Sequence, residues 1–287
     1  MAEPRLFVLG NAGIDTTLNV PRLPLPGETL MATGIARAPG GKGLNQAVVA
    51  ARCGVPVHFL APLGAEPETR IVRDALAETG LAACDLPDVG QPTDLSTLLV
   101  APNAENCIVS TGACAEALPA EAALGFVAAM RAGDMLLMQG NLSEAATLAA
   151  ARAAPHVVLN TAPLRWDYAR VLPECDLVVA NRLEAEMLTG LSDPFAAAGR
   201  LRGIVTIGAE GCVVAGLGAM APPPVRAVDS TGAGDTFCGV LAACLLRGTD
   251  LRRAVEAALA AAALAVTRAG CFTALPRHAE LAAIIAR

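Results

Sequence analysis

The chain has 287 residues, of which 54% are hydrophobic and 3% aromatic, and its formal net charge is -6. The negative charge argues against a nucleic-acid partner, and no apolar run reaches the ~18 residues that a membrane span needs. Residues 1–5 lack the basic and apolar regions of a signal peptide. The length suits one large α/β domain over residues 1–287, and we expect it to be cytoplasmic.

The nine cysteines are scattered and form no Cys-x-x-Cys pair, and the three histidines do not cluster with them. These spacings predict buried free thiols in a reducing compartment rather than disulfides. They also argue against a structural zinc site.

Short β-branched runs alternate with Ala- and Leu-rich stretches along the chain. Strands are predicted at residues 6–9, 57–60, 134–139, 157–160, 177–180 and 204–207. Helices are predicted at residues 44–53, 70–78, 120–130, 143–153 and 254–266. This alternation predicts a doubly wound, mostly parallel sheet flanked by helices. Ligands bind such a sheet at the carboxyl ends of its strands, where Asn160 and Asn181 lie.

Two segments, residues 17–36 and 93–110, interrupt this alternation. Both have the pattern of extended strands without intervening helices, which predicts a small antiparallel sheet outside the main one. Such a sheet would be a lid that covers a pocket and excludes water, and its edge could pair with a second copy in a homodimer. Two ordinary hairpins at the edge of the main sheet are the alternative.

Lys42 is the only lysine of the chain, which has 20 arginines. Lysine offers a compact, mobile charge, whereas arginine offers a wide planar fork. Gly40, Gly41 and Gly43 surround Lys42 and leave room for a ligand to approach the backbone. We therefore predict a binding role for Lys42, with an ordinary lysine in a surface loop as the alternative.

A second glycine-rich motif runs from Asp229 to Gly239. It follows residues 225–228, which are predicted to end a strand, and precedes a helix that includes residues 240–246. A helix that begins after a turn of small residues points N–H groups and its positive dipole end at an anion. Asp235, at the start of this helix, is either an N-cap or a general base that takes the proton of an attacking hydroxyl.

Both glycine-rich motifs resemble the two signatures of the PfkB carbohydrate kinase family, and of its ribokinase branch in particular. The similarity runs along almost the whole chain, from Gly27-Glu28-Thr29 to the tail at residues 265–270. The resemblance implies a ribokinase-like fold with a small β-sheet lid. It also implies an ATP-dependent, Mg²⁺-requiring transfer of a phosphoryl group to a hydroxyl of a small sugar or sugar derivative.

The resemblance also implies roles for individual residues. The base would be Asp235, and the backbone that holds the transferring charge would belong to Gly232, Ala233 and Gly234. The sugar would be held by Asp15, Gly40, Gly41, Lys42, Asn45 and Asn141. The nucleotide and magnesium would lie near Asn181, Glu184, Thr206, Gly208 and Gly211. A potassium ion would be bound around Asp229, Thr231, Ala265 and Gly270.

Two departures from the ribokinase pattern leave the sugar open. Ribokinases usually carry Glu where this chain has Asn141, and they have an Asn-Ala-Asp sequence where Gly13 and Ile14 precede Asp15. A lost polar contact in a sugar site changes which hydroxyls are matched. A nucleoside kinase of the same family is one alternative, although it needs an apolar or aromatic wall for the base. A sugar-binding sensor without turnover is another, against which the intact Asp235 argues.

Overall fold

Two β-sheets organise the chain in the computed structural model, which describes residues 3–102 and 106–286. Within these residues the main sheet has the strand order β13-β12-β11-β10-β9-β8-β1-β4-β5. Its strands are β1 (Leu6–Leu9), β4 (Val57–Leu60), β5 (Ala83–Asp85), β8 (Met135–Gln139), β9 (Val157–Asn160), β10 (Leu177–Asn181), β11 (Ile204–Thr206), β12 (Cys212–Val214) and β13 (Gly218–Met220). All neighbours from β11 to β5 are parallel, and β12 and β13 add an antiparallel edge.

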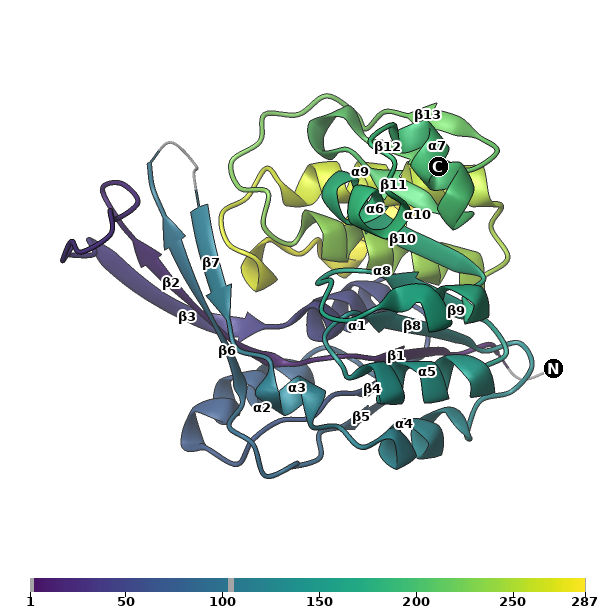
Figure 1. The fold of residues 1–287 in the computed structure, drawn as a ribbon, viewed down its shortest axis with the longest axis horizontal. Coiled ribbons are helices and arrows are strands. Elements are labelled where there is room, and N and C mark those ends of the chain that lie inside the picture. Colours follow the sequence, from purple (N-terminus) through teal and green to yellow (C-terminus); the bar gives the residue numbers. More distant parts are fainter. Residues whose placement is uncertain (1–2, 103–105, 287) are drawn as a thin grey trace.

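Helices cover both faces of this sheet, as the predicted alternation requires (Figure 1). One face packs against α1 (Lys42–Arg52), α2 (Arg70–Ala77), α8 (Ala233–Leu246), α9 (Leu251–Ala265) and α10 (His278–Ile285). The other face packs against α4 (Ala120–Val127) and α5 (Glu144–Ala153). The helices α6 (Arg182–Thr189) and α7 (Pro194–Leu201) pack on β10, β11 and β12. Because β1 lies between two layers of helices, all four of its residues are buried.

A smaller sheet projects from the carboxyl ends of the main strands (Figure 1). Its order is β3-β2-β6-β7, with β2 (Gly13–Asn19), β3 (Gly34–Gly40), β6 (Asp94–Val100) and β7 (Asn106–Ser110). The prediction of an antiparallel sheet is wrong for the central pair, since β2 and β6 are parallel. The reason is that β2 leaves β1 and β6 leaves β5 at the same end of the main sheet, so both run outward. We call this sheet the lid.

The lid strands reach closer to the main sheet than the predicted segments do. β2 begins at Gly13 and β3 ends at Gly40, whereas the predicted segment covered residues 17–36. Asp15 therefore lies on a lid strand rather than in a loop before it. The opposite partner of Asp15 on β3 is Ala38. The lid thus places Asp15 near its own base, close to the carboxyl ends of the main strands.

Residues 225–228 do not form the predicted strand. Three prolines at 222–224 supply no N–H to a β-ladder. The N–H groups of Val228 and Asp229 instead donate to the carbonyl of Val266, at 2.7 and 3.1 Å. The second motif therefore enters α8 from an irregular loop that is tied to the end of α9.

The other local predictions agree closely with the observed elements. Helix α1 begins at Lys42, two residues before its predicted start, and Ser143 caps α5 by accepting the N–H of Ala146 at 3.2 Å. Every cysteine in the described residues is a free thiol, but Cys84 and Cys107 are exposed rather than buried as predicted. Among the described helices, none combines the length and apolarity that crossing a bilayer requires.

Candidate active site

A cavity of about 440 Å³ lies where the lid meets the carboxyl ends of the main strands. Side chains and backbone from both glycine-rich motifs line it. The predicted residues among them are Asp15, Gly41, Lys42, Asn45, Asn141, Thr231, Gly232 and Asp235. The structure therefore brings the predicted sugar-binding residues to the predicted base.

Close backbone packing places the first motif at this cavity. Gly41 has φ 102°, and a Cβ there would lie 2.9 Å from the carbonyl oxygen of Asn11. At Gly43 a Cβ would lie 2.6 Å from the backbone nitrogen of Asn11. The start of α1 can therefore rest directly on the loop after β1 only because both residues are glycines. This contact places Lys42 and Asn45, three residues apart on α1, at the cavity wall.

Gly40 serves the cavity by leaving space for Asp15. A Cβ on Gly40 would overlap the Asp15 carboxylate, which occupies that space across the β2–β3 pair. Gly40 itself does not line the cavity, so its contribution is to the position of Asp15.

Asp235 is a buried carboxylate in the first turn of α8, with 6% of its surface exposed. Asn45 donates its Nδ2 to Oδ2 of Asp235 at 3.0 Å, and Gln46 donates its Nε2 to Oδ1 at 3.0 Å. The N-cap position belongs to Gly232, with no side-chain capping bond, so the N-cap alternative for Asp235 does not hold. The carboxylate instead lines the cavity, held by two amides.

Two charged groups face Asp235 across the cavity. Asp235 raises the pKa of Lys42 against the opposing effect of burial, so the ammonium stays charged. Burial raises the pKa of Asp15 to about 6; a hydrogen bond with Ser96 acts against this shift, the Asp235 charge adds to it and Lys42 acts against it. Lys42 is thus a partly buried cation between two carboxylates and not a lysine of an open surface loop.

The N-terminus of α8 leaves backbone donors free beside the carboxylate. Gly232 adopts φ 80°, in the left-handed region that favours glycine, and turns the chain into the helix. The N–H of Ala233 donates to the carbonyl of Ser230 at 3.3 Å. In the described part of the chain no group accepts the N–H of Gly234 or Asp235. These donors and the helix dipole make this point favourable for an anion.

The predicted nucleotide and magnesium residues lie together at the ends of β10 and β11, outside the cavity. Asn181 and Glu184 form a capping box at the start of α6, in which Glu184 N–H donates to Asn181 Oδ1 at 2.8 Å. The buried Glu184 carboxylate also accepts the Thr161 hydroxyl at 2.9 Å. Asn181 pairs with Thr206 across the two strands. The turn that follows β11 contains Gly208 and Gly211, with φ 66° and 101°.

The predicted potassium residues also come together. Asp229 accepts the N–H of Thr231 through Oδ1 and the N–H of Gly270 through Oδ2, each at 2.9 Å. The carbonyl of Ala265 accepts the N–H of Arg268 at 3.1 Å. Asp229 thereby joins the second motif to the tail at residues 265–270. Among the described residues, no three His, Cys, Asp or Glu side chains are grouped so as to hold a metal ion.

Sequence reasoning missed several residues of the site. Gln46 donates to the Asp235 carboxylate, and Ser96, Arg165 and Cys271 line the cavity. A signal existed for Ser96, because the two-residue period of a strand places Asp94, Ser96 and Leu98 on one face, and all three line the cavity. Arg165 and Cys271 come from irregular loops, where no periodicity indicates a direction.

Comparisons with known proteins agree with this geometry. The sequence profile of the "pfkB family carbohydrate kinase" matches residues 3–278. The ribokinase of Haemophilus influenzae is 32% identical over 96% of both chains. The crystal structure of the ribokinase of Thermotoga maritima superposes over all of both chains with a TM-score of 0.89 at 26% identity. The structure of the Arabidopsis thaliana ribokinase complexed with ribose and ATP superposes over 99% of both chains, with a TM-score of 0.85 at 24% identity. The chain therefore belongs to the pfkB family of carbohydrate kinases.

Proposed function

We propose that this ATP-dependent carbohydrate kinase phosphorylates a hydroxyl of ribose or of a closely related small sugar. The observation that carries the proposal is the position of Asp235, whose carboxylate lines the cavity beside the free N–H groups of α8. The choice of sugar is supported by the ribokinases among the relatives, such as that of Haemophilus influenzae.

The cavity offers a sugar both charges and unpaired acceptors. Oδ1 of Asn45 and Oδ1 of Asn141 are buried and have no partner among the described residues. Buried acceptors without partners are costly, so a ligand that brings hydroxyl donors is favoured here. The Asp15 carboxylate and the Lys42 ammonium add an acceptor and a donor that fit vicinal hydroxyls.

The reaction needs a base and a site for negative charge. A sugar hydroxyl beside Asp235 would give its proton to that carboxylate as its oxygen attacks the γ-phosphate of ATP. The N–H groups of Gly234 and Asp235, and the dipole of α8, would hold the charge on the transferring phosphoryl group. Asn45 and Gln46 orient the carboxylate for this step. Positioning and electrostatics supply most of the catalysis in phosphoryl transfer.

The cations that the family resemblance implies fit the residues in different ways. The Glu184 carboxylate already accepts three hydrogen bonds, from Thr161 and from the backbone and side chain of Asn181. It would therefore hold Mg²⁺ through water, which suits an ion that keeps several of its waters. A bound Mg²⁺ neutralises charge on the phosphates. Asp229 and the carbonyl groups near Ala265 would hold K⁺ beside the α8 turn.

The lid edges and the free thiols support two further proposals, one on the oligomeric state and one on the location in the cell. Strands β3 and β7 are the lid edges, and Ile35 and Val109 on them are exposed by 65% and 69%. Edges of this kind can pair with a second copy, which supports a homodimer through the lid. Free thiols throughout the described chain support a cytoplasmic location.

A nucleoside acceptor is the weaker alternative. In the described residues the apolar side chains at the lid side of the cavity are Leu98 and Ile108, and no aromatic ring lines it. Trp166 and Tyr168 stack on each other at a different surface. A base would thus lack the stacking partner that such a ligand favours.

One assay separates these candidates. ATP consumption is measured with pentoses, hexoses, polyols and nucleosides, with Asp235→Asn as the inactive control. We expect turnover with ribose or a related pentose and little with nucleosides. If a nucleoside is turned over fastest, the acceptor is a nucleoside and not a sugar. Sugar binding without turnover would support a sensor.

A further inference from the structure

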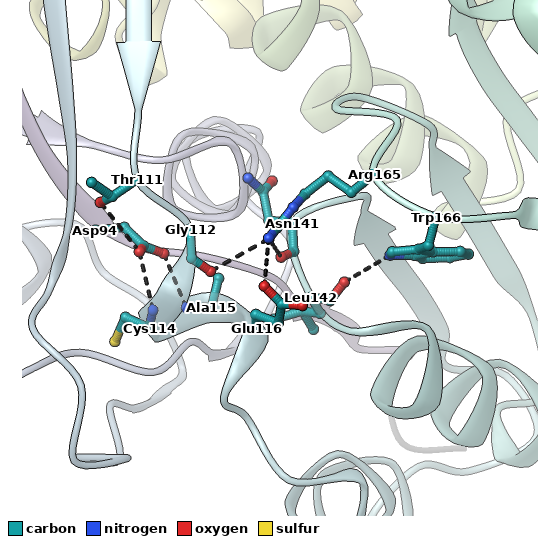
Figure 2. A network of polar contacts seen from close by, with 10 residues as sticks. All are labelled: Asp94, Thr111, Gly112, Cys114, Ala115, Glu116, Asn141, Leu142, Arg165 and Trp166. Atoms are coloured by element: carbon teal, nitrogen blue, oxygen red, sulfur yellow. Dashed lines mark hydrogen bonds and ion pairs between the residues drawn. The ribbon is translucent and has the colours of Figure 1, made fainter.

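Arg165 connects three segments that are distant in the sequence (Figure 2). It lies in the loop after β9. Its Nη1 donates to the carbonyl of Asn141 at 2.9 Å and to that of Gly112 at 3.4 Å. Its Nη2 forms an ion pair with Glu116 at 2.6 Å. Gly112 and Glu116 belong to the base of the lid, whereas Asn141 follows β8 in the main sheet.

We propose that Arg165 is a positioning residue that ties the base of the lid to the acceptor residue Asn141 and thereby sets the affinity for the sugar. This role depends on the proposed function, in which a sugar is the acceptor. It adds Arg165, which takes no part in the contacts with Asp235. A planar guanidinium directs its donors along fixed lines, so one side chain can hold two carbonyls and a carboxylate together.

Gly112 provides independent support for this role. A Cβ on Gly112 would lie 2.8 Å from Nη1 and 3.2 Å from Cζ of Arg165. The backbone of Gly112 has φ -153° and ψ 11°, which is outside the left-handed region but neither helical nor extended. Besides adopting this conformation, the glycine provides room for the guanidinium to lie directly against the lid backbone.

The lid side of the connection is firmly built. Glu116 ends α3 (Ala113–Glu116), whose start is held by the buried Asp94, the first residue of β6. The Asp94 carboxylate accepts the N–H of Cys114 at 3.1 Å and that of Ala115 at 3.0 Å (Figure 2). Because β6 is a central lid strand, these bonds attach α3 to the lid. Arg165 thus contacts a part of the lid that is fixed to its strands.

The acceptor side is held in a similar way. Trp166 donates its Nε1 to the carbonyl of Leu142 at 2.9 Å, next to the carbonyl that Arg165 holds (Figure 2). Two successive side chains therefore fix two successive peptides. Both accepting groups are backbone carbonyls, so the buried Oδ1 of Asn141 keeps no partner among the described residues and can accept a sugar hydroxyl.

The expected effect is on sugar affinity rather than on chemistry. Arg165 lines the cavity, but Asp235 and the N-terminus of α8 hold no hydrogen bond to it. The Arg165 and Glu116 side chains are 30% and 59% exposed, so their ion pair alone contributes little. The consequence of losing Arg165 should come mainly through the position of Asn141.

The test compares variants with the best sugar from the acceptor panel, so the wild-type value is the reference whichever sugar that is. For Arg165→Met we expect the sugar KM to rise about tenfold, as for loss of one hydrogen bond to a charged group, with kcat and the KM for ATP nearly unchanged. Gly112→Ala should give the same pattern because it displaces the guanidinium without removing it. Arg165→Lys should restore little, since an ammonium cannot span the three partners.

The matched control is Arg170→Met. Arg170 also pairs with a glutamate, Glu144 at 3.1 Å, but does not line the cavity, so the sugar KM of this variant should stay at the wild-type value.

Asn141→Ala tests whether Arg165 affects sugar binding through Asn141. If Arg165 acts through Asn141, the variant that combines Arg165→Met with Asn141→Ala should bind sugar no more weakly than Asn141→Ala alone. Additive losses, an unchanged KM in both Arg165→Met and Gly112→Ala, or an equal change in Arg170→Met would overturn the proposal. Thermal unfolding of each variant separates these outcomes from loss of folding, and Gly112→Ala decides if Arg165→Met does not fold.

Discussion

Asn45 and Asp235 are 190 residues apart in the sequence, and the amide of one donates to the carboxylate of the other at 3.0 Å. This bond joins the motif that carries the only lysine to the motif that begins α8. Gln46 forms the second bond to the same carboxylate, also at 3.0 Å, and is itself held by Gln139 at 2.8 Å. Asn45, which would hold the acceptor, thus also holds the proposed base, so the proposed binding and proton transfer would share one framework.

Lys42 should resist conservative replacement. The guanidinium is bulkier than the ammonium, and the start of α1 packs closely on the loop after β1. We expect Lys42→Arg to raise the sugar KM nearly as much as Lys42→Ala, with a smaller effect on kcat. Steady-state kinetics of the two variants measure this directly.

Amine labelling provides a second reading of the same residue. Lys42 is the only lysine, so apart from the N-terminus an amine reagent reports on this one site. Bound sugar should protect it. Full activity of Lys42→Arg together with unprotected labelling under saturating sugar would show that Lys42 has no binding role.

Sugar binding should weaken in acid because of Asp15. Its pKa is raised to about 6, so the carboxyl gains a proton and loses its negative charge as the pH falls through that value. A neutral carboxyl accepts hydroxyl donors less strongly, so the sugar KM should rise several-fold between about pH 7.5 and pH 5. Asp15→Asn should bind weakly at both pH values and show a flat profile. A wild-type KM that does not change over this range would argue against a sugar contact at Asp15.

Potassium should activate the enzyme if the Asp229 region holds a monovalent cation. Asp229 links the α8 turn to residues 265–270, so an ion there would stabilise the backbone that forms the anion site. We expect rates in potassium chloride to exceed those in choline chloride by about fivefold or more at equal ionic strength, the lower end of ordinary coupling between two sites. Equal rates would mean that no such ion contributes.

The sequence predicted well those parts of the fold that repeat with a regular period. The strand at residues 57–60 and that at 157–160 match β4 and β9 at both ends. The parallel pairing of β2 with β6 was not predicted, because pairing across 80 or so residues depends on where each strand leaves the main sheet and not on its own pattern. The false strand at residues 225–228 shows the related limit, since valine favours strands but the partner of this segment is the end of α9.

The candidate site likewise contains residues that the sequence indicates and residues whose place depends on how distant segments meet. Lys42, Asn45 and Asp235 lie in the two glycine-rich motifs, Asp15 was predicted from the family resemblance, and the structure places all four at one cavity. Arg165 could not be predicted, because its position depends on how three loops meet. Asn181 and Glu184 were predicted beside the nucleotide, and the structure also gives them a capping box, which a sequence cannot separate from a ligand role.

The central claim is that Asp235 accepts the proton of the attacking hydroxyl, and kcat of Asp235→Asn tests it most directly. Asparagine keeps the size of the side chain but cannot take the proton, and it can accept from only one of the two amides that now contact Oδ1 and Oδ2. We predict a fall in kcat of about 10²-fold or more, the usual range for loss of a general base. The sugar KM should stay within a few-fold of the wild-type value. A kcat close to that of the wild type would contradict the account, because the carboxylate would then not be the base.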